Sequence, residues 1–531
     1  MNVAGGFCRL ISLALFLSPA VCLAQGSAPA DDIARLREQI AAQQRQLDDA
    51  KKALQAAQAA IDAQQQILNR LVAGQQAQTA SIAPHSEAAQ PSAAPPARPA
   101  EAGSAEVDVK GKPISPLSFH IGGADFTPGG FLDFSTVWRS RDIGSGVATS
   151  FASVPFANTS AGRMSEFRSS AANSRFTLTV TENPTKNTTV TGYIEGDFYG
   201  NQPTSQYVTS NSNTLRMRHF WVNLAFGKWE ILGGQTWSLT TPNRVGVSQV
   251  SSNVFVGLGE DSNYLTGLVW SRPGQLRAAY HPSSHWALAA AVENPEQYVT
   301  TGTTLPAFAS TEVDNGSTPA TPNARPDITA KAAYDTQVGG KALHFELAGF
   351  SRRFRTSPAE GKYFDATGMG GSFTTSLEMA KNFRLIVTAF DGSGGGRYVA
   401  GLGPDVVIGP DGSISPVHST AGIAGFEYAP NPRSQFFAYY GGAYFARNYT
   451  LLSPGNYLGF GYPGSSSSAN RQFQEPMFGY YYTFRKSPRY GAMQLITQYS
   501  YLTRAPWYVA AGSPSTAYAH MVFGSLRFTL P

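Results

Sequence analysis

Residues 190–199 have the sequence VTGYIEGDFY, in which apolar and polar side chains alternate with a period of two. Val190, Ile194 and Phe198 fall on one face of an extended strand, and glycines lie between them. Glu195 and Asp197 fall on the opposite face. Because successive side chains of a strand point to opposite faces, this stretch predicts a strand with one apolar face and one charged face.

The same alternation recurs from about residue 106 to the end of the chain. It is clear in residues 175–180, 478–484 and 521–530. Apolar and aromatic side chains outside, with polar side chains inside, are typical of an outer-membrane barrel. We therefore predict an all-β transmembrane barrel of antiparallel strands over residues 106–531. A water-soluble β-sandwich array or propeller is the structural alternative, but no internal repeat supports it.

The connections between the predicted strands alternate between short and long. Seven short turns and eight long loops make fifteen connections, which join about sixteen strands. An even number places both chain ends on the short-turn side, which is periplasmic in this class. Residues 117–124 are either an extra strand or a plug-like lead-in, so eighteen strands stays an alternative. The long loops are expected near residues 142–163, 200–213, 238–262, 295–325, 355–366, 391–417, 448–470 and 504–516.

The N-terminus indicates export. Arg9 and the short apolar run Leu10–Leu17 predict a signal peptide over residues 1–24. The two cysteines, Cys8 and Cys22, both lie inside it. The predicted location is the outer membrane of a Gram-negative bacterium, where surrounding lipid is the first partner.

Apolar residues recur every seven positions over residues 31–73, which predicts a helical coiled coil in the periplasm. Gln43 and Gln64 sit at the second core position, where they can hydrogen-bond across a trimer axis. A single amphipathic helix is the alternative. Residues 74–105, rich in Ala, Gln, Ser and Pro, are expected to form a disordered linker. The first core position carries Ile33, Ile40, Leu47, Leu54, Ile61 and Leu68.

Charged residues opposite the apolar faces are candidates for lining a water-filled lumen, because such side chains let a pore select by charge. By strict alternation, Arg216 and Arg218 fall on the same face as the apolar residues after them, which are expected to face outward. A β-bulge that resets the phase, or a place at the barrel rim, would explain the conflict. The other candidates are Asp133, Arg139, Arg141, Arg175, Glu195, Asp197, Arg277, Glu346, Arg384 and Glu427.

The third long loop, residues 238–262, is the candidate constriction. In a porin of sixteen strands the third loop usually folds into the barrel. Arg244, Glu260 and Asp261 are the charged residues of this loop that we expect to narrow the pore.

Four stretches resemble the DcaP-like family of trimeric outer-membrane porins: GYIEGDF (192–198), LRMRHF (215–220), LGGQTWS (232–238) and QLRAAY (275–280). The resemblance covers mainly the first half of the barrel, and the phosphate-selective porins are a close second.

The resemblance implies passive diffusion of small hydrophilic, anionic solutes such as dicarboxylates. It also implies a homotrimer, and it assigns Arg216, Arg218 and Arg277 as pore arginines. Phosphate or sugar selectivity is the alternative, as is a structural envelope tether with a non-conducting barrel.

Catalytic residues, bound metals and cofactors are not expected. None of the eight histidines lies in a nucleophile motif. His281 and His285 have a spacing of four, but Pro282 makes that segment a turn rather than a metal-binding helix face. The glycine-rich stretch 391–396 lacks the lysine of a phosphate loop. We therefore predict that the chain is not an enzyme and does not bind nucleic acid.

Overall fold

A computed structural model of the chain describes residues 115–200, 213–249, 260–295, 325–400 and 402–531. The predicted signal peptide (1–24), coiled coil (31–73) and linker (74–105) lie outside these residues. Among the described residues, none of the helices has the length and hydropathy needed to span a membrane.

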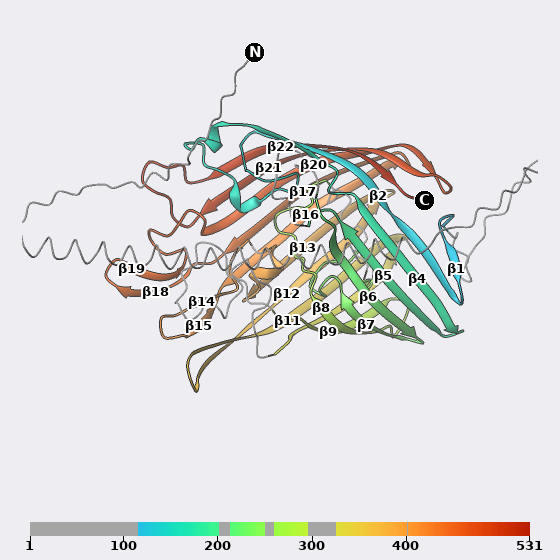
Figure 1. Cartoon of the computed structure of the whole chain (residues 1–531), viewed down its shortest axis with the longest axis horizontal. Helices are drawn as coiled ribbons and strands as arrows, with labels where there is room; N and C mark the ends of the chain where they lie inside the picture. The colour runs from blue at the N-terminus through green and yellow to red at the C-terminus, as the bar shows by residue number, and fades with distance from the viewer. Residues whose placement is uncertain (1–114, 201–212, 250–259, 296–324, 401) are drawn as a thin grey trace, which may run out of the picture. The chain divides into compact units, whose positions relative to one another are not determined.

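Sixteen antiparallel strand positions form the wall, because β3 and β4 pair one after the other with β2 and share a position (Figure 1). The first half comprises β2 (Ala124–Arg139), β3 (Glu166–Ser170), β4 (Arg175–Thr185), β5 (Thr188–Asp197), β6 (Arg216–Phe226), β7 (Trp229–Gln235), β8 (Gly274–Tyr280), β9 (Trp286–Glu293) and β10 (Asp327–Val338). The second half comprises β11 (Lys341–Ala359), β12 (Lys362–Ala380), β13 (Phe383–Ser393), β16 (His418–Asn431), β17 (Ser434–Phe445), β20 (Asn470–Ser487), β21 (Gly491–Pro506) and β22 (Ala517–Thr529).

The first and last wall strands close the barrel. β2 pairs with β22 from Phe131 opposite Thr529 to Arg139 opposite Met521. The two ends of the described barrel also meet, since the Ser115 hydroxyl donates a hydrogen bond to the Pro531 carbonyl, 3.2 Å. The predicted count of sixteen strands and the common side of both ends are confirmed.

The short strand β1 (Phe119–Ile121) folds back on the start of β2 and adds no wall position. It accounts for the lead-in predicted at residues 117–124.

The outer face is apolar and carries aromatic pairs next to the short turns. Trp229 lies against Tyr280, with ring centroids 4.6 Å apart. Trp286 and Tyr334 form a similar pair at 4.7 Å. Aromatic side chains at this level are typical of the girdle that a transmembrane barrel places at the membrane interface.

One predicted loop is wrong. Residues 355–366 are not a long loop, because β11 and β12 continue to a tight turn at residues 360–361. The other long connections contain the small hairpins β14 (Val406–Ile408) with β15 (Ile414–Pro416), and β18 (Asn448–Ser453) with β19 (Asn456–Phe460). They also contain the 3-10 turns η1 (Phe151–Ser153), η2 (Ala161–Arg163) and η5 (Gly396–Tyr398).

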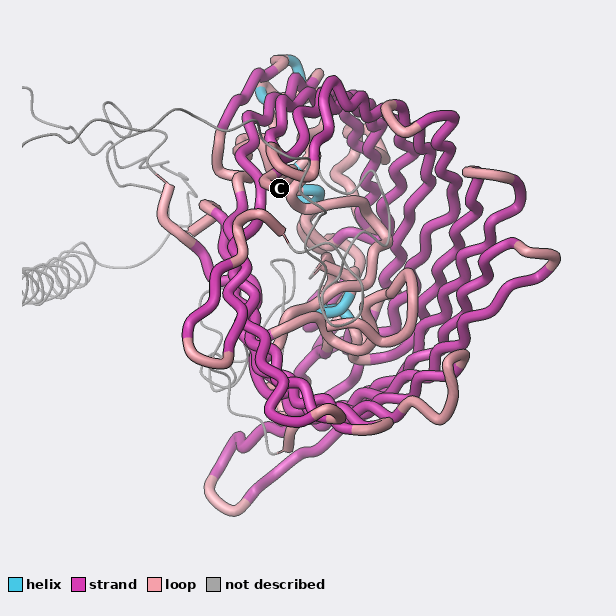
Figure 2. The backbone as a smooth tube through the Cα atoms, turned by 90° about the vertical axis from the view of Figure 1, so that its right-hand side faces the viewer, coloured by secondary structure: helices cyan, strands magenta, loops and turns pink. Residues whose placement is uncertain are grey.

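Toward the loop ends much of the interior is apolar, although the sequence predicts polar side chains opposite the outward apolar face. Loop residues such as Phe151 and Val269 pack against inward-facing wall residues such as Phe350, Phe390 and Phe473. In Figure 2 loop segments occupy the space that the strands enclose. Burial of apolar side chains stabilises these loops inside the barrel.

The closing seam carries a buried ion pair. Asp133 on β2 lies directly opposite Arg527 on β22, and Arg527 Nε donates to Asp133 Oδ2 over 2.6 Å. Arg527 Nη2 also donates to Glu260 Oε1 over 3.0 Å. Arg527 therefore links the seam to the loop between β7 and β8.

Replacing Arg527 with Met should leave the Asp133 and Glu260 side chains buried without their cation. Removing one partner of a buried ion pair costs roughly 3–5 kcal/mol, so we expect a free energy of unfolding lower by about that amount. Denaturant unfolding in lipid vesicles measures it. Arg355→Met removes an exposed pair with Asp365 and should change little. Equal losses in both variants would contradict the role of the seam pair.

Candidate functional site

The described parts of the connection between β7 and β8, residues 236–249 and 260–273, contact the inside of the barrel wall. The backbone N–H of Asn243 donates to both carboxylate oxygens of Glu346 on β11, at 3.1 and 3.2 Å. The N–H of Gly246 donates to Asp335 Oδ2 on β10, at 2.9 Å. Two backbone donors thus anchor this part of the loop to neighbouring wall strands.

An arginine of the same loop contacts a more distant strand of the wall. Arg244 Nη2 lies 2.9 Å from each carboxylate oxygen of Glu427 on β16. Arg384 on β13 is 3.9 Å from the same carboxylate, and the Tyr439 hydroxyl donates to it at 2.8 Å. Two guanidinium groups therefore share one carboxylate.

The returning part of the loop touches the wall at glycines. The Thr266 N–H donates to Glu475 Oε2 on β20, at 3.0 Å. Gly267 has a φ of +89°, and a Cβ there would lie 2.6 Å from the carbonyl oxygen of Gly442. Only glycine combines this conformation with such a close approach.

A second ion cluster joins β5, β6 and the same loop. Arg218 Nε donates to Glu195 Oε1 at 2.6 Å, and Arg218 Nη1 donates to Asp197 Oδ2 at 3.0 Å. Arg216 makes two hydrogen bonds to Asp197, at 2.9 and 2.7 Å. Arg175 on β4 is 3.5 Å from Glu195. Two carboxylates thus lie among three arginines.

A β-bulge explains how Arg216 and Arg218 reach this cluster. Glu195 pairs with His219, but the next residue of β5, Gly196, pairs with Met217, so Arg218 is the extra residue. The bulge lets the arginines face inward although Phe220 and the following apolar residues face outward. Of the two explanations proposed from the sequence, a β-bulge or a place at the barrel rim, the bulge is therefore the correct one.

Several residues at this cluster were missed by the sequence interpretation. The Tyr264 hydroxyl accepts a hydrogen bond from Arg218 Nη2 at 3.0 Å. The Arg272 guanidinium lies over the rings of Trp237 and Trp270, 5.0 and 5.6 Å from their centroids. The only feature of the sequence that could have indicated these residues is the high frequency of Trp, Tyr and Arg in and after the third long loop.

Burial and neighbouring charges change the pKa values of two loop residues. It raises the pKa of the Glu260 carboxyl to about 7, although the charge of Arg527 opposes this. Burial also tends to raise the pKa of Tyr264, but the positive charges of Arg218, Arg175 and Arg272 lower it to about 8. Both pKa values therefore lie closer to neutral pH than the ordinary values of a glutamate and a tyrosine.

The candidate residues differ in how much of each side chain is exposed. Relative exposure is 38% for Arg216, 29% for Arg384, 25% for Arg244 and 23% for Arg175. It is only 8% for Glu195, 5% for Glu427 and 2% for Asp197. Within these clusters the four arginine side chains are therefore more accessible than the carboxylates they bind, whereas Arg218, a predicted pore residue, is as buried as its partners, with 4% of its side chain exposed.

Other candidates hold loops in place. Arg139 is completely buried and donates to Glu166 and to the carbonyl of Gly146. Arg141 donates to the carbonyl of Gly162. Arg277 is buried and donates to the carbonyl of Trp237.

Asp261 is also buried and accepts a hydrogen bond from the N–H of Thr149, at 3.0 Å. It links the loop between β7 and β8 to the loop that follows β2. Among the described residues, no group of three His, Cys, Asp or Glu side chains is arranged to hold a metal ion.

The fold is similar to that of solved outer-membrane proteins. The outer membrane channel DcaP of Acinetobacter baumannii matches with a TM-score of 0.54 and 18% identity, over 77% of this chain and 97% of that chain. This confirms, at the level of the fold, the resemblance predicted from the sequence.

Two further matches have lower scores, and nothing more is drawn from them. An anion-selective porin from Comamonas acidovorans matches with a TM-score of 0.43 and 11% identity, over 76% of this chain and 99% of that chain. Salmonella typhi OmpF in complex with daunomycin matches with a TM-score of 0.42 and 11% identity, over 78% and 100%. No family model matches the chain, and no curated protein matches its sequence significantly.

Replacing Gly267 with Ala should dislodge the loop between β7 and β8 from the wall. A strained backbone at such a position costs about 1–3 kcal/mol, and the clash with Gly442 adds to that cost. Gly246→Ala is the matched control, because its φ is +56° but its Cβ would meet nothing within 4 Å. We expect a lower thermal midpoint and faster proteolysis of the loop for Gly267→Ala than for Gly246→Ala. Indistinguishable variants would contradict the close contact.

Proposed function

We propose that the protein is an outer-membrane porin through which small hydrophilic, anionic solutes diffuse passively. The observation that supports the proposal is that, in the two ion clusters, four arginine side chains are more exposed than the carboxylates they bind. Arg175, Arg216, Arg244 and Arg384 present donors to the interior, while Glu195 and Glu427 are buried behind them. An anion meets positive charge first on such a surface.

The carboxylates have a role in this arrangement. Each holds its arginines in a fixed position, so less side-chain entropy is lost when a guanidinium binds a solute oxygen. Arginine also matches the paired oxygens of a carboxylate or a phosphate. Dicarboxylate-like solutes are therefore the class we favour, with phosphate as the nearest alternative.

The loop between β7 and β8 is the proposed constriction. Arg244 places its guanidinium in the lumen through the contact with Glu427. Glu260 and Asp261 are buried, so we assign them to anchoring the loop rather than to contact with solute. Arg139 and Arg277 receive the same anchoring role.

The cell location and assembly follow the same proposal. The long-loop end of the barrel faces outward from the cell, and the short turns face the periplasm. We propose that residues 31–73 form a periplasmic coiled-coil stalk behind the linker, and that stalk and barrel assemble as a homotrimer.

A structural tether with a non-conducting barrel is the second candidate. The observation in its favour is the apolar cluster of loop and wall residues toward the loop ends of the barrel. Conductance in planar lipid bilayers separates the two functions, because a tether needs no open path.

The double variant Arg244→Gln with Arg384→Gln should lose anion preference. The zero-current potential across a bilayer with a KCl gradient measures it, and we expect a shift toward equal permeability of the two ions. The physical reason is the loss of two cations around Glu427, which leaves one buried carboxylate.

Arg485→Gln with Arg489→Gln is the matched control. Both side chains lie over Tyr490 at a short turn, 5.6 and 5.4 Å from its ring centroid. The control should keep the wild-type potential. Equal shifts in both double variants would exclude the lumen arginines, and an absence of conductance in the wild type would exclude the porin.

A further inference from the structure

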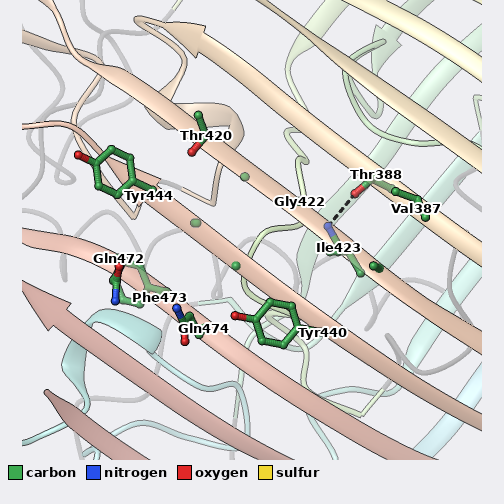
Figure 3. Close-up of a pocket in the computed structure, with 14 residues that line it drawn as sticks. Val387, Thr388, Thr420, Gly422, Ile423, Tyr440, Tyr444, Gln472, Phe473 and Gln474 are labelled. Atoms are coloured by element: carbon green, nitrogen blue, oxygen red, sulfur yellow. Dashed lines mark hydrogen bonds between the residues drawn. The ribbon is translucent and has the colours of Figure 1, made fainter.

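A groove of about 430 Å³ lies on the outside of the wall, across β13, β16, β17 and β20 (Figure 3). Phe473, Ala443 and Ile423 point into the barrel and are buried. Their neighbours along the strands therefore face outward. The groove residues on this outer face are Val387, Thr420, Gly422, Ala424, Tyr440, Gly442, Tyr444, Gln472 and Gln474.

The groove changes in polarity along its length. Figure 3 shows Thr420, Tyr444 and Gln472 at one end, which is the end nearer the long loops. Val387 and Tyr440 lie toward the other end, nearer the middle of the wall. Gly422, Gly442 and Ala424 form the floor of the groove, and their small size gives the groove its depth. A ligand that is polar at its outer end and mostly apolar below fits this groove, in which Gln474 adds one polar side chain between the two ends.

Two arginines stand beyond the polar end. Trp507 contacts Tyr444, with ring centroids 6.0 Å apart. The guanidinium groups of Arg447 and Arg471 lie over the Trp507 ring, 5.6 and 5.7 Å from its centroid. Neither makes an ion pair within the described part of the chain, and Arg471 Nε is buried without a hydrogen-bond partner.

From these contacts we propose that the groove binds a phosphorylated, acylated lipid of the outer leaflet. An acyl chain lies on the glycine and alanine floor, and the phosphate of the headgroup meets Arg447 and Arg471. Basic pockets at the membrane surface recognise anionic headgroups in this way. The proposal rests on a barrel in the membrane and is independent of which solute crosses the lumen.

The charge pattern favours this occupant over a second copy of the chain. A lipid of the outer leaflet brings both the anion and the hydrocarbon to the correct ends of the groove.

Binding of lipid A to the full-length protein in non-ionic detergent tests the proposal, with bound lipid measured by native mass spectrometry. Lipid A carries two phosphates and several acyl chains. The double variant Arg447→Gln with Arg471→Gln should bind at least about tenfold more weakly, equivalent to about 1.4 kcal/mol. Arg485→Gln with Arg489→Gln removes the same charge from the opposite end of β20 and should bind like the wild type.

Two further measurements distinguish binding through the phosphate headgroup from binding through the acyl chain. Ala424→Leu fills the groove without touching either arginine and should also weaken binding. Dephosphorylated lipid A should bind the wild type weakly, and excess inorganic phosphate should not displace intact lipid A. Heat-modifiable mobility on a gel confirms that each variant remains folded.

Three results would overturn the proposal. One is equal weakening in both arginine double variants. Another is displacement of lipid A by inorganic phosphate alone, which would assign the arginines to free phosphate. The third is a change of oligomeric mass in Ala424→Leu with unchanged lipid binding, which would assign the groove to contact between copies.

Discussion

The structure depends on one constraint: the first and last strands of a closed barrel must hydrogen-bond to each other. A strand edge in hydrocarbon leaves backbone groups unpaired, each at a cost of several kcal/mol. The pairing of β2 with β22 removes both edges. The same seam carries the Asp133–Arg527 pair, and Arg527 also holds Glu260 of the loop between β7 and β8. Closure of the wall and placement of the inner loop are therefore linked through one side chain.

In the proposed function, the inner loops determine which solutes can cross the barrel. Sixteen strands enclose a space wide enough for an aqueous channel. Loop residues such as Phe151 and Val269 fill the part toward the loop ends, while Arg244 bonds across the interior to Glu427. The side chains of Arg175, Arg216, Arg244 and Arg384 remain partly exposed in the interior. The carboxylates of Glu230 and Asp335 are exposed to a similar extent. Selectivity in this account comes from placing carboxylates behind arginines rather than from an excess of arginine alone.

The alternation of side chains was sufficient to predict the wall. It predicted a strand over residues 190–199, which the structure has as β5 (Thr188–Asp197), together with the last strand and, through the turn pattern, the number of strands. Each of these depends on local sequence, because a strand fixes the face of every side chain within it. Arg216 and Arg218 stayed ambiguous because a bulge changes the register with the neighbouring strand, and that register is not encoded locally.

The interior was harder to predict for a related reason. Phe350, Phe390 and Phe473 face inward because loops distant in sequence cover them, so polar side chains line only part of the interior. The Arg244–Glu427 contact joins residues 183 positions apart. Tyr264 and Arg272 were missed because their significance comes from the β5–β6 cluster that they meet only after folding.

The central claim is that the barrel conducts small anions by means of its exposed arginines. Uptake into liposomes that contain the purified wild-type protein tests it most directly, with succinate compared to an uncharged solute of similar size. The account predicts that both enter and that succinate enters faster at low salt, with the difference reduced at high salt because ions screen the guanidinium charges. Entry of neither solute, or faster entry of the uncharged one at low salt, would contradict it.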